Sequence, residues 1–270
     1  MAQGVSVHFG VQSVDPTQYV QYYGTLDGPV NDARVMYDIA KGQGFVPVQV
    51  LLNQNATAGA VLTALKAALA TITDGDILLL TYSGHGDRIP DASMPGNNVD
   101  TWCLYDRMLL SHELAALWPL SRVRVILVSD SCHSGTIGRK WGKKAPSKAL
   151  PPNIALATYR AHQNMYDAIA IANNPAKVRR GAFNVMSPIN QGGASIILMG
   201  ACQDNQEAQD GSPNSVFTAN LKAVWDNGQF QTYANFVASI SALMPQDQTP
   251  SYLPFGYRDP AFEASRPFAI

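Results

Sequence analysis

A cysteine and a histidine are the residues of this sequence best placed to do chemistry, because each follows an apolar run. Cys132 comes shortly after residues 123–128, and His85 comes shortly after residues 77–82. Apolar runs of this length are typical of buried strands in a parallel sheet, and such sheets place their chemistry at the carboxyl ends of the strands. The sequence therefore predicts that Cys132 and His85 lie at the same edge of one sheet.

A cysteine near a histidine can act as a nucleophile, since the thiolate attacks and the imidazole can exchange its proton. Gly84 and Gly86 flank the histidine, and we expect them to allow a tight turn with φ > 0 that projects the imidazole. The alternatives are a buried structural cysteine, a hydrogen-bonded turn histidine, or a zinc site that adds His133. No other ligand pair at zinc-finger spacing accompanies them, so the pair favours nucleophilic catalysis.

Strand and helix patterns alternate around these two runs and predict an α/β fold. The β-α-β-α-β order at the start implies right-handed crossovers and a mostly parallel central sheet with helices on both faces. We expect strands at 4–9, 45–52, 77–82, 102–105, 123–128 and 194–198, and helices at 27–41, 111–117, 216–225 and 233–244, with a further helix capped by Thr57.

Three stretches show no clear pattern and are expected to be irregular. Residues 87–100 are rich in Pro, Asn and Gly and read as a polar insertion. Residues 159–172 could be helical, but the Pro-Pro, Asn-Asn-Pro and Arg-Arg-Gly segments around them indicate exposed loop. The tail over 254–270 is expected to lie irregularly on the surface.

Length and composition bound the class of protein. The chain has 270 residues, 46% of them hydrophobic, and we interpret it as one domain, 1–270. A net charge of −1 gives no reason to bind nucleic acid or membrane. Three widely spaced cysteines argue against a disulfide framework, and neither a basic leader nor an 18-residue apolar stretch is present. We therefore expect a cytoplasmic protein, with its oligomeric state left open.

Charge is unevenly distributed along the chain. Residues 136–190 contain nine Lys or Arg and one acid, a net charge of +8, whereas the remainder carries −9. Such a basic segment is typical of an exposed linker or of a surface that binds an anionic partner.

Two paired motifs resemble those of the caspase-like cysteine peptidases, and most closely those of the metacaspases and bacterial caspase homologues. Tyr82-Ser-Gly-His-Gly86 and Asp130-Ser-Cys-His-Ser-Gly135 stand in the family's order, with His85 and Cys132 47 positions apart. The resemblance extends over most of the chain, through Gly24-Thr-Leu-Asp-Gly-Pro-Val-Asn-Asp-Ala33, Trp102-Cys-Leu-Tyr-Asp106 and Gly200-Ala-Cys-Gln-Asp-Asn-Gln206. It implies a caspase-like sandwich with a large-subunit-like part, 1–135, a basic linker or insertion, 136–190, and a small-subunit-like part, 191–270.

The resemblance also implies a reaction and a set of site residues. It makes His85 and Cys132 a catalytic dyad that cleaves peptide bonds in protein substrates, and it makes the N–H groups of Gly86 and Cys132 the donors to the oxyanion. No third triad member can be identified. The family's preference for Arg or Lys maps onto a pocket of Asp32, Ser83 and Asp130, with Pro29 where the family has a cysteine.

Carboxylates in such a pocket can pair with a basic side chain of the substrate. The alternatives are a solvated helix residue for Asp32 and a strand-end cap for Asp130. If the pocket is anionic, the basic linker is a substrate of the enzyme itself. We expect self-cleavage there, after one of seven candidate basic residues. These candidates are Arg139, Lys140, Lys143, Lys144, Lys148, Arg179 and Arg180. The rival interpretations are a catalytically silent scaffold of the same fold and a module that binds a polyanion.

The calcium site of many metacaspases is not carried over to this chain, and we expect neither a metal nor a cofactor. Asp106 has a plausible counterpart in the family's acidic cluster. The acidic pair expected next is Ser111-His112 here, however, and the further acid falls near Arg139. A hard divalent cation needs several oxygen ligands without an adjacent fixed cation.

We therefore predict that peptidase activity does not require calcium. Activity measured after exhaustive chelation should equal activity with added calcium, because the ligand set is interrupted. A strict requirement, abolished by chelator and restored by calcium titration, would contradict this mapping.

Overall fold

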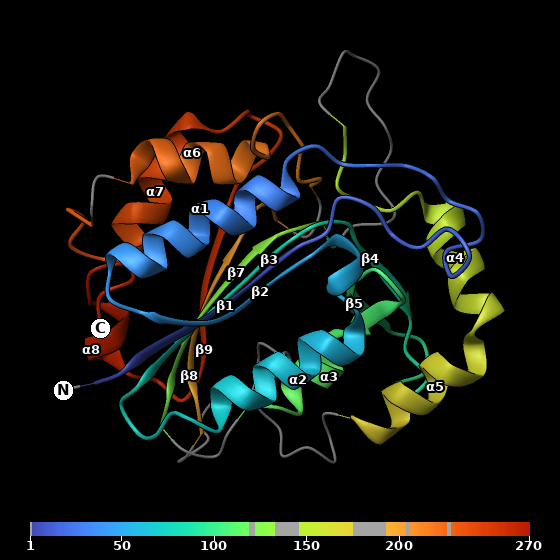
Figure 1. Ribbon diagram of the computed structural model, residues 1–270, viewed down its shortest axis with the longest axis horizontal. Coiled ribbons are helices and arrows are strands. Elements are labelled where there is room, and N and C mark those ends of the chain that lie inside the picture. The colour runs from blue at the N-terminus through green and yellow to red at the C-terminus, as the bar shows by residue number, and fades with distance from the viewer. Residues whose placement is uncertain (1, 119–121, 133–145, 175–192, 204–205, 226–227) are drawn as a thin grey trace.

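A six-stranded sheet runs through the centre of the chain in the order β2-β1-β3-β7-β8-β9 (Figure 1). The computed structural model describes residues 2–118, 122–132, 146–174, 193–203, 206–225 and 228–270. Neighbouring strands are parallel from β2 to β8, and β9 closes one edge antiparallel to β8. The strands are β1 (Gly4–Gly10), β2 (Val46–Leu52), β3 (Ile77–Ser83), β7 (Arg124–Asp130), β8 (Ser195–Gly200) and β9 (Ser251–Gly256).

The central strands are buried on both faces because successive side chains point into two different cores. In β3, Ile77 and Leu79 join one hydrophobic cluster, while Leu78, Leu80 and Tyr82 join the other. This alternation is the two-residue period of an extended strand. Burial on both sides explains why the sequence of β3 is continuously apolar.

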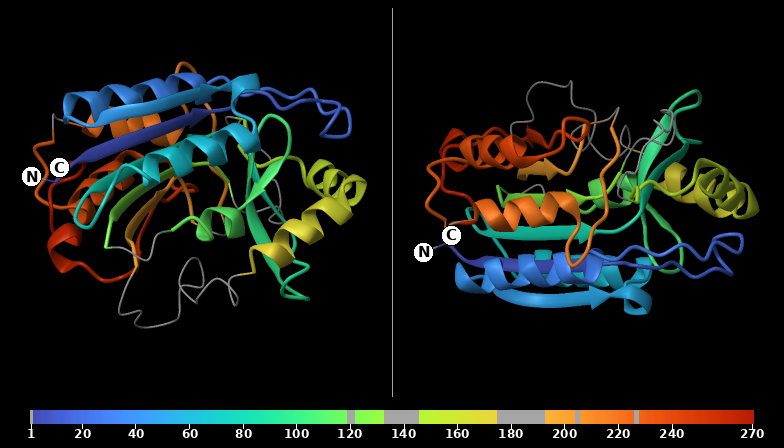
Figure 2. Two further views of the ribbon diagram at one scale, coloured as in Figure 1. Left: turned by 60° about the horizontal axis from the view of Figure 1, so that its bottom comes forward. Right: turned by 90° about the horizontal axis from the view of Figure 1, so that it is seen from above.

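Helices cover both faces of the sheet, as the views of Figure 2 show for α1 and α2 on opposite sides. Helices α1, α6 and α7 contribute to one core, and α2 and α3 contribute to the other. Thr57 caps α2, as expected, by accepting from the Ala60 N–H. The helices are α1 (Pro29–Gly42), α2 (Ala58–Leu69), α3 (Ser111–Ala115), α4 (Pro152–Ala161), α5 (Gln163–Ala172), α6 (Val216–Val224), α7 (Tyr233–Leu243) and α8 (Pro260–Glu263), with a 3-10 turn at Asn53–Asn55.

The prediction that 87–100 is an irregular polar insertion is wrong, because much of this stretch forms a second, antiparallel sheet. Its strands are β4 (Gly86–Pro90), β5 (Asn98–Cys103) and β6 (Met108–Leu110). Of the Pro, Asn and Gly residues that suggested a loop, Pro95, Gly96 and Asn97 lie in the connection between β4 and β5, whereas Pro90 ends β4 and Asn98 begins β5. The hairpin begins at Gly86, so it starts directly beside His85.

The basic segment is also more ordered than its composition suggested. Within its described part, α4 and α5 pack beside β4 and α3, and Pro152 stands at the first position of α4. Proline is favoured at that position because a backbone N–H there has no partner within the helix, so the lack of one in proline costs nothing. Lys148 is fully buried, so this part of the segment is not exposed loop. The candidates Arg139, Lys140, Lys143, Lys144, Arg179 and Arg180, and likewise His133, lie outside the described residues.

The tail is not an irregular surface segment. It supplies the edge strand β9 and helix α8, and Phe262 and Phe268 are buried in the core beneath α1, α6 and α7. Pro254 is tolerated in β9 because an edge strand pairs on one side only. Over the part of the chain that the structure describes, no helix has both the length and the apolar character needed to cross a membrane.

Candidate active site

The strand register brings His85 and Cys132 to the same edge of the sheet. Ser83 at the end of β3 pairs with Asp130 at the end of β7, and His85 and Cys132 each lie two residues further on. The expectation of a positive φ at the glycines around His85 is wrong, since neither Gly84 nor Gly86 adopts one.

Close packing, and not a left-handed turn, makes glycine necessary beside the histidine. A Cβ atom at Gly86 would overlap the Cys132 carbonyl oxygen and the Ser131 hydroxyl. A Cβ atom at Gly84 would lie 2.5 Å from the Tyr82 hydroxyl. The loops that follow β3 and β7 are therefore in direct contact, which holds the two candidate catalytic residues near each other.

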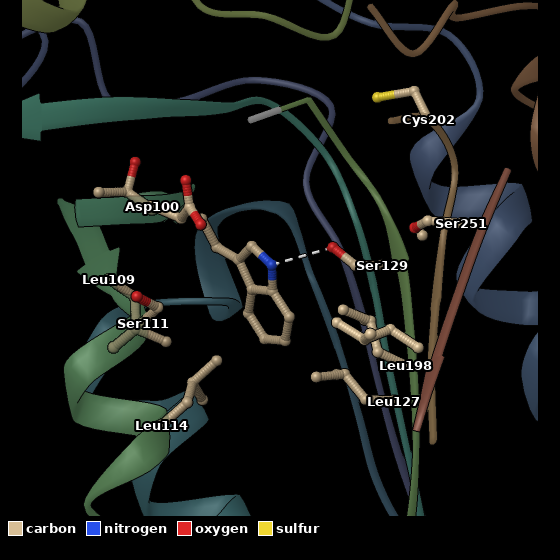
Figure 3. Close-up of a pocket in the computed structure, with 13 residues that line it drawn as sticks. Asp100, Leu109, Ser111, Leu114, Leu127, Ser129, Leu198, Cys202 and Ser251 are labelled. Atoms are coloured by element: carbon tan, nitrogen blue, oxygen red, sulfur yellow. Dashed lines mark hydrogen bonds between the residues drawn. The ribbon is translucent and has the colours of Figure 1, made fainter. Parts of the chain in front are cut away.

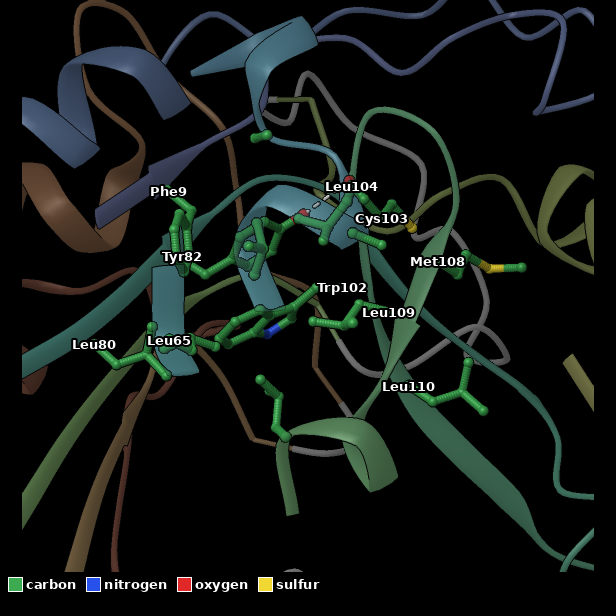
Figure 4. Packing of buried hydrophobic residues seen from close by; sticks show 14 of the residues in the cluster. Phe9, Leu65, Leu80, Tyr82, Trp102, Cys103, Leu104, Met108, Leu109 and Leu110 are labelled. Atoms are coloured by element: carbon green, nitrogen blue, oxygen red, sulfur yellow. Dashed lines mark hydrogen bonds between the residues drawn. The ribbon is translucent and has the colours of Figure 1, made fainter. Parts of the chain in front are cut away.

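The backbone of His85 rests on an aromatic pair in the core. The Tyr82 hydroxyl lies 2.7 Å from the His85 carbonyl oxygen and 3.0 Å from the Cys103 carbonyl oxygen. The Tyr82 ring stacks on Trp102, with ring centroids 4.5 Å apart (Figure 4). Cys103 is fully buried in this cluster, as expected for a core cysteine. The turn that presents the imidazole is thus supported from below by packed rings.

The two nitrogens of the His85 imidazole face different partners. Nδ1 lies 3.1 Å from the Lys148 carbonyl oxygen, and Nε2 lies 3.4 Å from the Tyr22 hydroxyl. Burial lowers the pKa of His85 to about 4. At neutral pH the imidazole is therefore uncharged in this arrangement.

The Cys132 thiol is also buried, and it belongs to the hydrophobic core to which α1, α6 and α7 contribute. The Ala208 N–H donates to its Sγ atom over 2.8 Å, and the Ser147 hydroxyl lies 4.0 Å away. Burial, together with the neighbouring Cys202 thiol, raises the pKa of Cys132 above its ordinary value. The cysteine is therefore a neutral thiol here, and a thiolate requires that its proton be removed.

The three residues of the predicted pocket come together around one lysine. The Lys148 Nζ atom lies 2.8 Å from the Ser83 hydroxyl, 2.8 Å from an Asp130 carboxylate oxygen and 3.5 Å from an Asp32 carboxylate oxygen. It also donates to the Asp130 backbone carbonyl over 2.8 Å. All four side chains are buried, so the ammonium and the carboxylates are paired away from water.

Residues just before and within α6 hold the two carboxylates in place. The Asn214 amide and the Ser215 N–H each donate to Asp32 over 3.0 Å. The Thr218 hydroxyl donates to Asp130 over 2.7 Å. In addition, Asp210 accepts from the backbone N–H of Gly28 at the start of α1. Asp32 is therefore buried and paired, and is not a solvated helix residue. Asp130 also accepts from the Thr218 N–H over 3.2 Å, so its carboxylate caps the first turn of α6 as well.

The pairing sets the charge state of the pocket. Burial alone would lower the pKa of Lys148, but Asp130 and Asp32 outweigh it and raise that pKa above its ordinary value. Burial raises the pKa of the Asp130 carboxyl, and the Lys148 charge opposes this. The ammonium thus favours the ionised form of the Asp130 carboxyl, which burial alone would disfavour.

Lys148 belongs to an extended segment, 146–150, that pairs with both walls of the site. On one side the Lys148 N–H donates to the Ala208 carbonyl over 2.9 Å, and the Pro146 carbonyl accepts from the Asp210 N–H over 2.7 Å. On the other side the Gly86 N–H donates to the Lys148 carbonyl over 3.0 Å, and the Leu150 N–H donates to the Gly86 carbonyl over 3.2 Å. The Lys148 carbonyl is therefore held between the Gly86 N–H and the His85 imidazole.

Sequence reasoning missed several of these contributors. Thr218 lies within the helix expected at 216–225 and Ser215 just before it, and neither had a predicted role in the site. Ala208 carries no chemical signal because it acts through its backbone. Lys148 was one of seven basic candidates with nothing to single it out. The polar run before α6 is the one signal that could have pointed to partners for the carboxylates.

A separate cavity of about 380 Å³ lies on the other face of the sheet, between α3, β5 and the strands β7, β8 and β9. Figure 3 shows its mainly apolar walls, with Leu114, Leu127 and Leu198 among the labelled residues. The Trp102 indole N–H, which also lines the cavity, donates to the Ser129 hydroxyl over 3.1 Å. Cys202 lines this cavity, whereas His85 and Cys132 do not.

The residues considered for calcium have other partners. Asp106 accepts from the Ala58 N–H at the start of α2, where a carboxylate is favoured by the helix dipole. His112 lies 3.4 Å from an Asp91 carboxylate oxygen. Among the described residues, no group of three or more His, Cys, Asp or Glu side chains could hold a metal ion.

Comparison with known sequences matches the chain to a peptidase family. The sequence profile described as "Caspase domain" matches residues 14–259. Metacaspase-4 from Arabidopsis thaliana is 30% identical over 137 residues, which are 43% of this chain and 32% of that protein. The match thus spans about a third of that relative's length.

Two solved structures resemble the fold. The crystal structure of protein GSU0716 from Geobacter sulfurreducens has a TM-score of 0.84 and 37% identity, over 99% of both chains. Caspase-1 from Spodoptera frugiperda has a TM-score of 0.54 and 9% identity, over 94% of this chain and 85% of that chain, so this likeness concerns the fold alone. The expected α/β caspase-like sandwich is confirmed.

We predict that Lys148→Met destabilises the chain by about 3–5 kcal/mol at neutral pH, because it leaves two buried carboxylates without a cation. The measurement is denaturant unfolding in a Cys132→Ala background, which removes the candidate nucleophile. Lys66→Met, at an exposed position in α2, is the control and should change stability by no more than about 0.5 kcal/mol.

The loss should also depend on pH in a defined direction. Without Lys148, the folded-state pKa of Asp130 rises further above its unfolded value, so the folded chain binds more protons than the unfolded chain. The stability of Lys148→Met therefore falls as pH rises from 5 to 8, towards and through that raised pKa. A loss that is constant over this range, or no loss at all, would show that the pocket carboxylates are not charge-compensated by Lys148.

Proposed function

Since this chain belongs to the caspase domain family of cysteine peptidases, we propose that it is an endopeptidase that cleaves after Lys or Arg, with Cys132 and His85 as its dyad. The observation that carries the specificity is the Lys148 ammonium, seated among Asp32, Ser83 and Asp130. The family supports protein substrates, and the occupied pocket supports a basic residue at the cleavage site.

In the proposed reaction, the Cys132 thiolate attacks the carbonyl carbon of the residue that fills the pocket. The C–N bond then breaks, and His85 gives a proton to the departing amine. Water hydrolyses the resulting thioester, which releases the acid and restores the thiol. The Gly86 N–H already donates to the Lys148 carbonyl oxygen, which supports its role as an oxyanion donor, and the Cys132 N–H is proposed as the second.

Electrostatics explains why a basic residue is selected. Two buried carboxylates need a cation, and a substrate aspartate would add a third negative charge to the same small volume. The Ser83 hydroxyl and the Asp130 backbone carbonyl accept hydrogen bonds from the ammonium, and an Asp130 carboxylate oxygen pairs with its charge at 2.8 Å. The pocket therefore suits lysine at least as well as arginine.

We further propose that the first substrate is the chain itself, at the bond between Lys148 and Ala149. The segment 146–150 is extended and paired on both sides, as a bound peptide substrate is in a strand-addition mode of recognition. The Lys148 carbonyl oxygen lies 3.1 Å from His85 Nδ1 and accepts from the Gly86 N–H, the proposed oxyanion donor. The segment also fills the pocket, so an external substrate must displace it or wait until it is cut.

The test of the enzymatic proposal is a panel of Lys, Arg and Asp reporter peptides. We expect turnover of the Lys and Arg reporters and none of the Asp reporter. Cys132→Ala and His85→Ala should each lower kcat/KM by orders of magnitude, because the two residues act as one unit. Cys103→Ala is the control, since it removes a buried thiol of the core and should leave activity in place.

Retained turnover in a well-folded Cys132→Ala chain would refute the dyad, and it would favour another source of activity. A preference for the Asp reporter would refute the pocket. A wild-type chain that is folded and cleaves none of the peptides would support the catalytically silent scaffold instead.

Self-cleavage is tested by following the purified wild-type chain over time. We expect fragments 1–148 and 149–270, with a new N-terminus at Ala149, that stay associated because β7 and β8 pair across the two fragments. Lys148→Gln and Cys132→Ala should stay intact, whereas Arg160→Gln, at an exposed position in α4, should still be cut.

Two outcomes would contradict cleavage at this bond. One is a wild-type chain that cleaves Lys reporters yet remains whole. The other is a new terminus within 139–145, with Lys148→Gln cut as efficiently as the wild-type chain.

A further inference from the structure

Tyr22 contacts the His85 imidazole at Nε2, whereas the segment with Lys148 contacts it at Nδ1. Its hydroxyl is 3.4 Å from His85 Nε2, and the two rings meet edge to face with centroids 5.8 Å apart. The tyrosine is partly buried and packs on the core that contains Tyr82 and Trp102. No step of the proposed reaction involves this contact.

The chain around Tyr22 is built to hold its hydroxyl in that position. Tyr19 is fully buried, and its hydroxyl donates to the Leu104 carbonyl over 2.7 Å, which anchors the loop. Val20 and Gln21 then adopt φ values of +45° and +62°. A β-branched residue in this left-handed region is strained, and such strain persists only where the surroundings enforce it.

Gly24 supplies the second constraint on the tyrosine. A Cβ atom at this position would overlap the Tyr22 hydroxyl oxygen, so the chain passes directly against the phenol. The phenol is thus confined between the returning chain and the imidazole. An ordinary surface tyrosine needs neither the strained turn nor the close approach.

We propose that Tyr22 is a positioning residue for the His85 imidazole, an inference that rests on the peptidase function proposed above. The Lys148 carbonyl can only accept a hydrogen bond, so the nitrogen that faces it, Nδ1, carries the hydrogen of the neutral ring. Nε2 then has a lone pair, to which the Tyr22 hydroxyl donates.

A hydroxyl suits this position because it can donate in one step and accept in the next. When His85 has gained the proton that the Cys132 thiol loses, both nitrogens carry a hydrogen. The Nε2–H then donates to the Tyr22 oxygen, and Nδ1–H remains directed at the departing amine. After Nδ1 has given up its proton, the Nε2–H keeps the same partner. Tyr22 therefore keeps the reactive nitrogen aimed at the scissile bond throughout the reaction.

The activity test compares Tyr22→Phe with Tyr23→Phe. Tyr23 is 71% exposed and its hydroxyl donates to Gln21, so it serves as a matched control. With a Lys reporter, Tyr22→Phe should lower kcat about tenfold, the effect of one lost hydrogen bond, with little change in KM. In a His85→Ala background the same substitution should have no further effect.

A purely structural role would give a different pattern. It would lower activity in proportion to stability, and it would do so in the His85→Ala background as well. Equal kcat for Tyr22→Phe and wild-type protein would overturn the inference while leaving the proposed peptidase function intact.

An activity-independent measurement tests the contact even if no reporter is turned over. In the Cys132→Ala chain with 15N-labelled histidine, the His85 signals are assigned among the five histidines by loss in His85→Gln. We expect His85 to show the hydrogen on Nδ1 at neutral pH. Tyr22→Phe should shift the Nε2 signal, and Tyr23→Phe should not. An Nε2 signal that is unchanged in Tyr22→Phe would refute the positioning role.

Discussion

A lysine ammonium paired with two buried carboxylates is the interaction on which the rest of the site depends. Asp32 and Asp130 come from α1 and β7, and in the interior their charges would repel each other strongly. A single cation between them removes that repulsion and brings an extended segment of chain with it. Any ligand that replaces Lys148 must therefore bring a positive charge of its own, and this requirement is the physical basis of the proposed selectivity.

The second constraint is the close approach of two loops at the sheet edge. Gly86 touches the Cys132 carbonyl and the Ser131 hydroxyl, and the Tyr82 hydroxyl bonds the His85 carbonyl from below. These contacts set the spacing between the loops before any substrate binds. The imidazole and the thiol can then be aligned by small adjustments within a rigid frame, which is what efficient proton transfer and attack require.

Burial also affects the protonation states of the two candidate catalytic residues. It lowers the pKa of His85 and raises that of Cys132, so both are neutral while the segment 146–150 fills the site. A neutral pair is less reactive than a thiolate beside an imidazolium. In the proposed reaction, the segment that occupies the site therefore also keeps the thiol and the imidazole in their less reactive, neutral forms.

The sequence by itself determined the sheet and the pair of chemical residues, because buried parallel strands are continuously apolar and their ends meet at one edge. It also indicated the pocket residues through their motifs. It did not reveal that 86–90, 98–101 and 251–256 form strands or that Pro152 begins a helix, since pairing partners and N-terminal positions are properties of the fold. Only the tertiary structure selected Lys148 from seven basic residues and placed Tyr22 on the imidazole. These contacts join residues that are more than 60 positions apart in the sequence and meet only in the folded interior, so no local sequence pattern could indicate them.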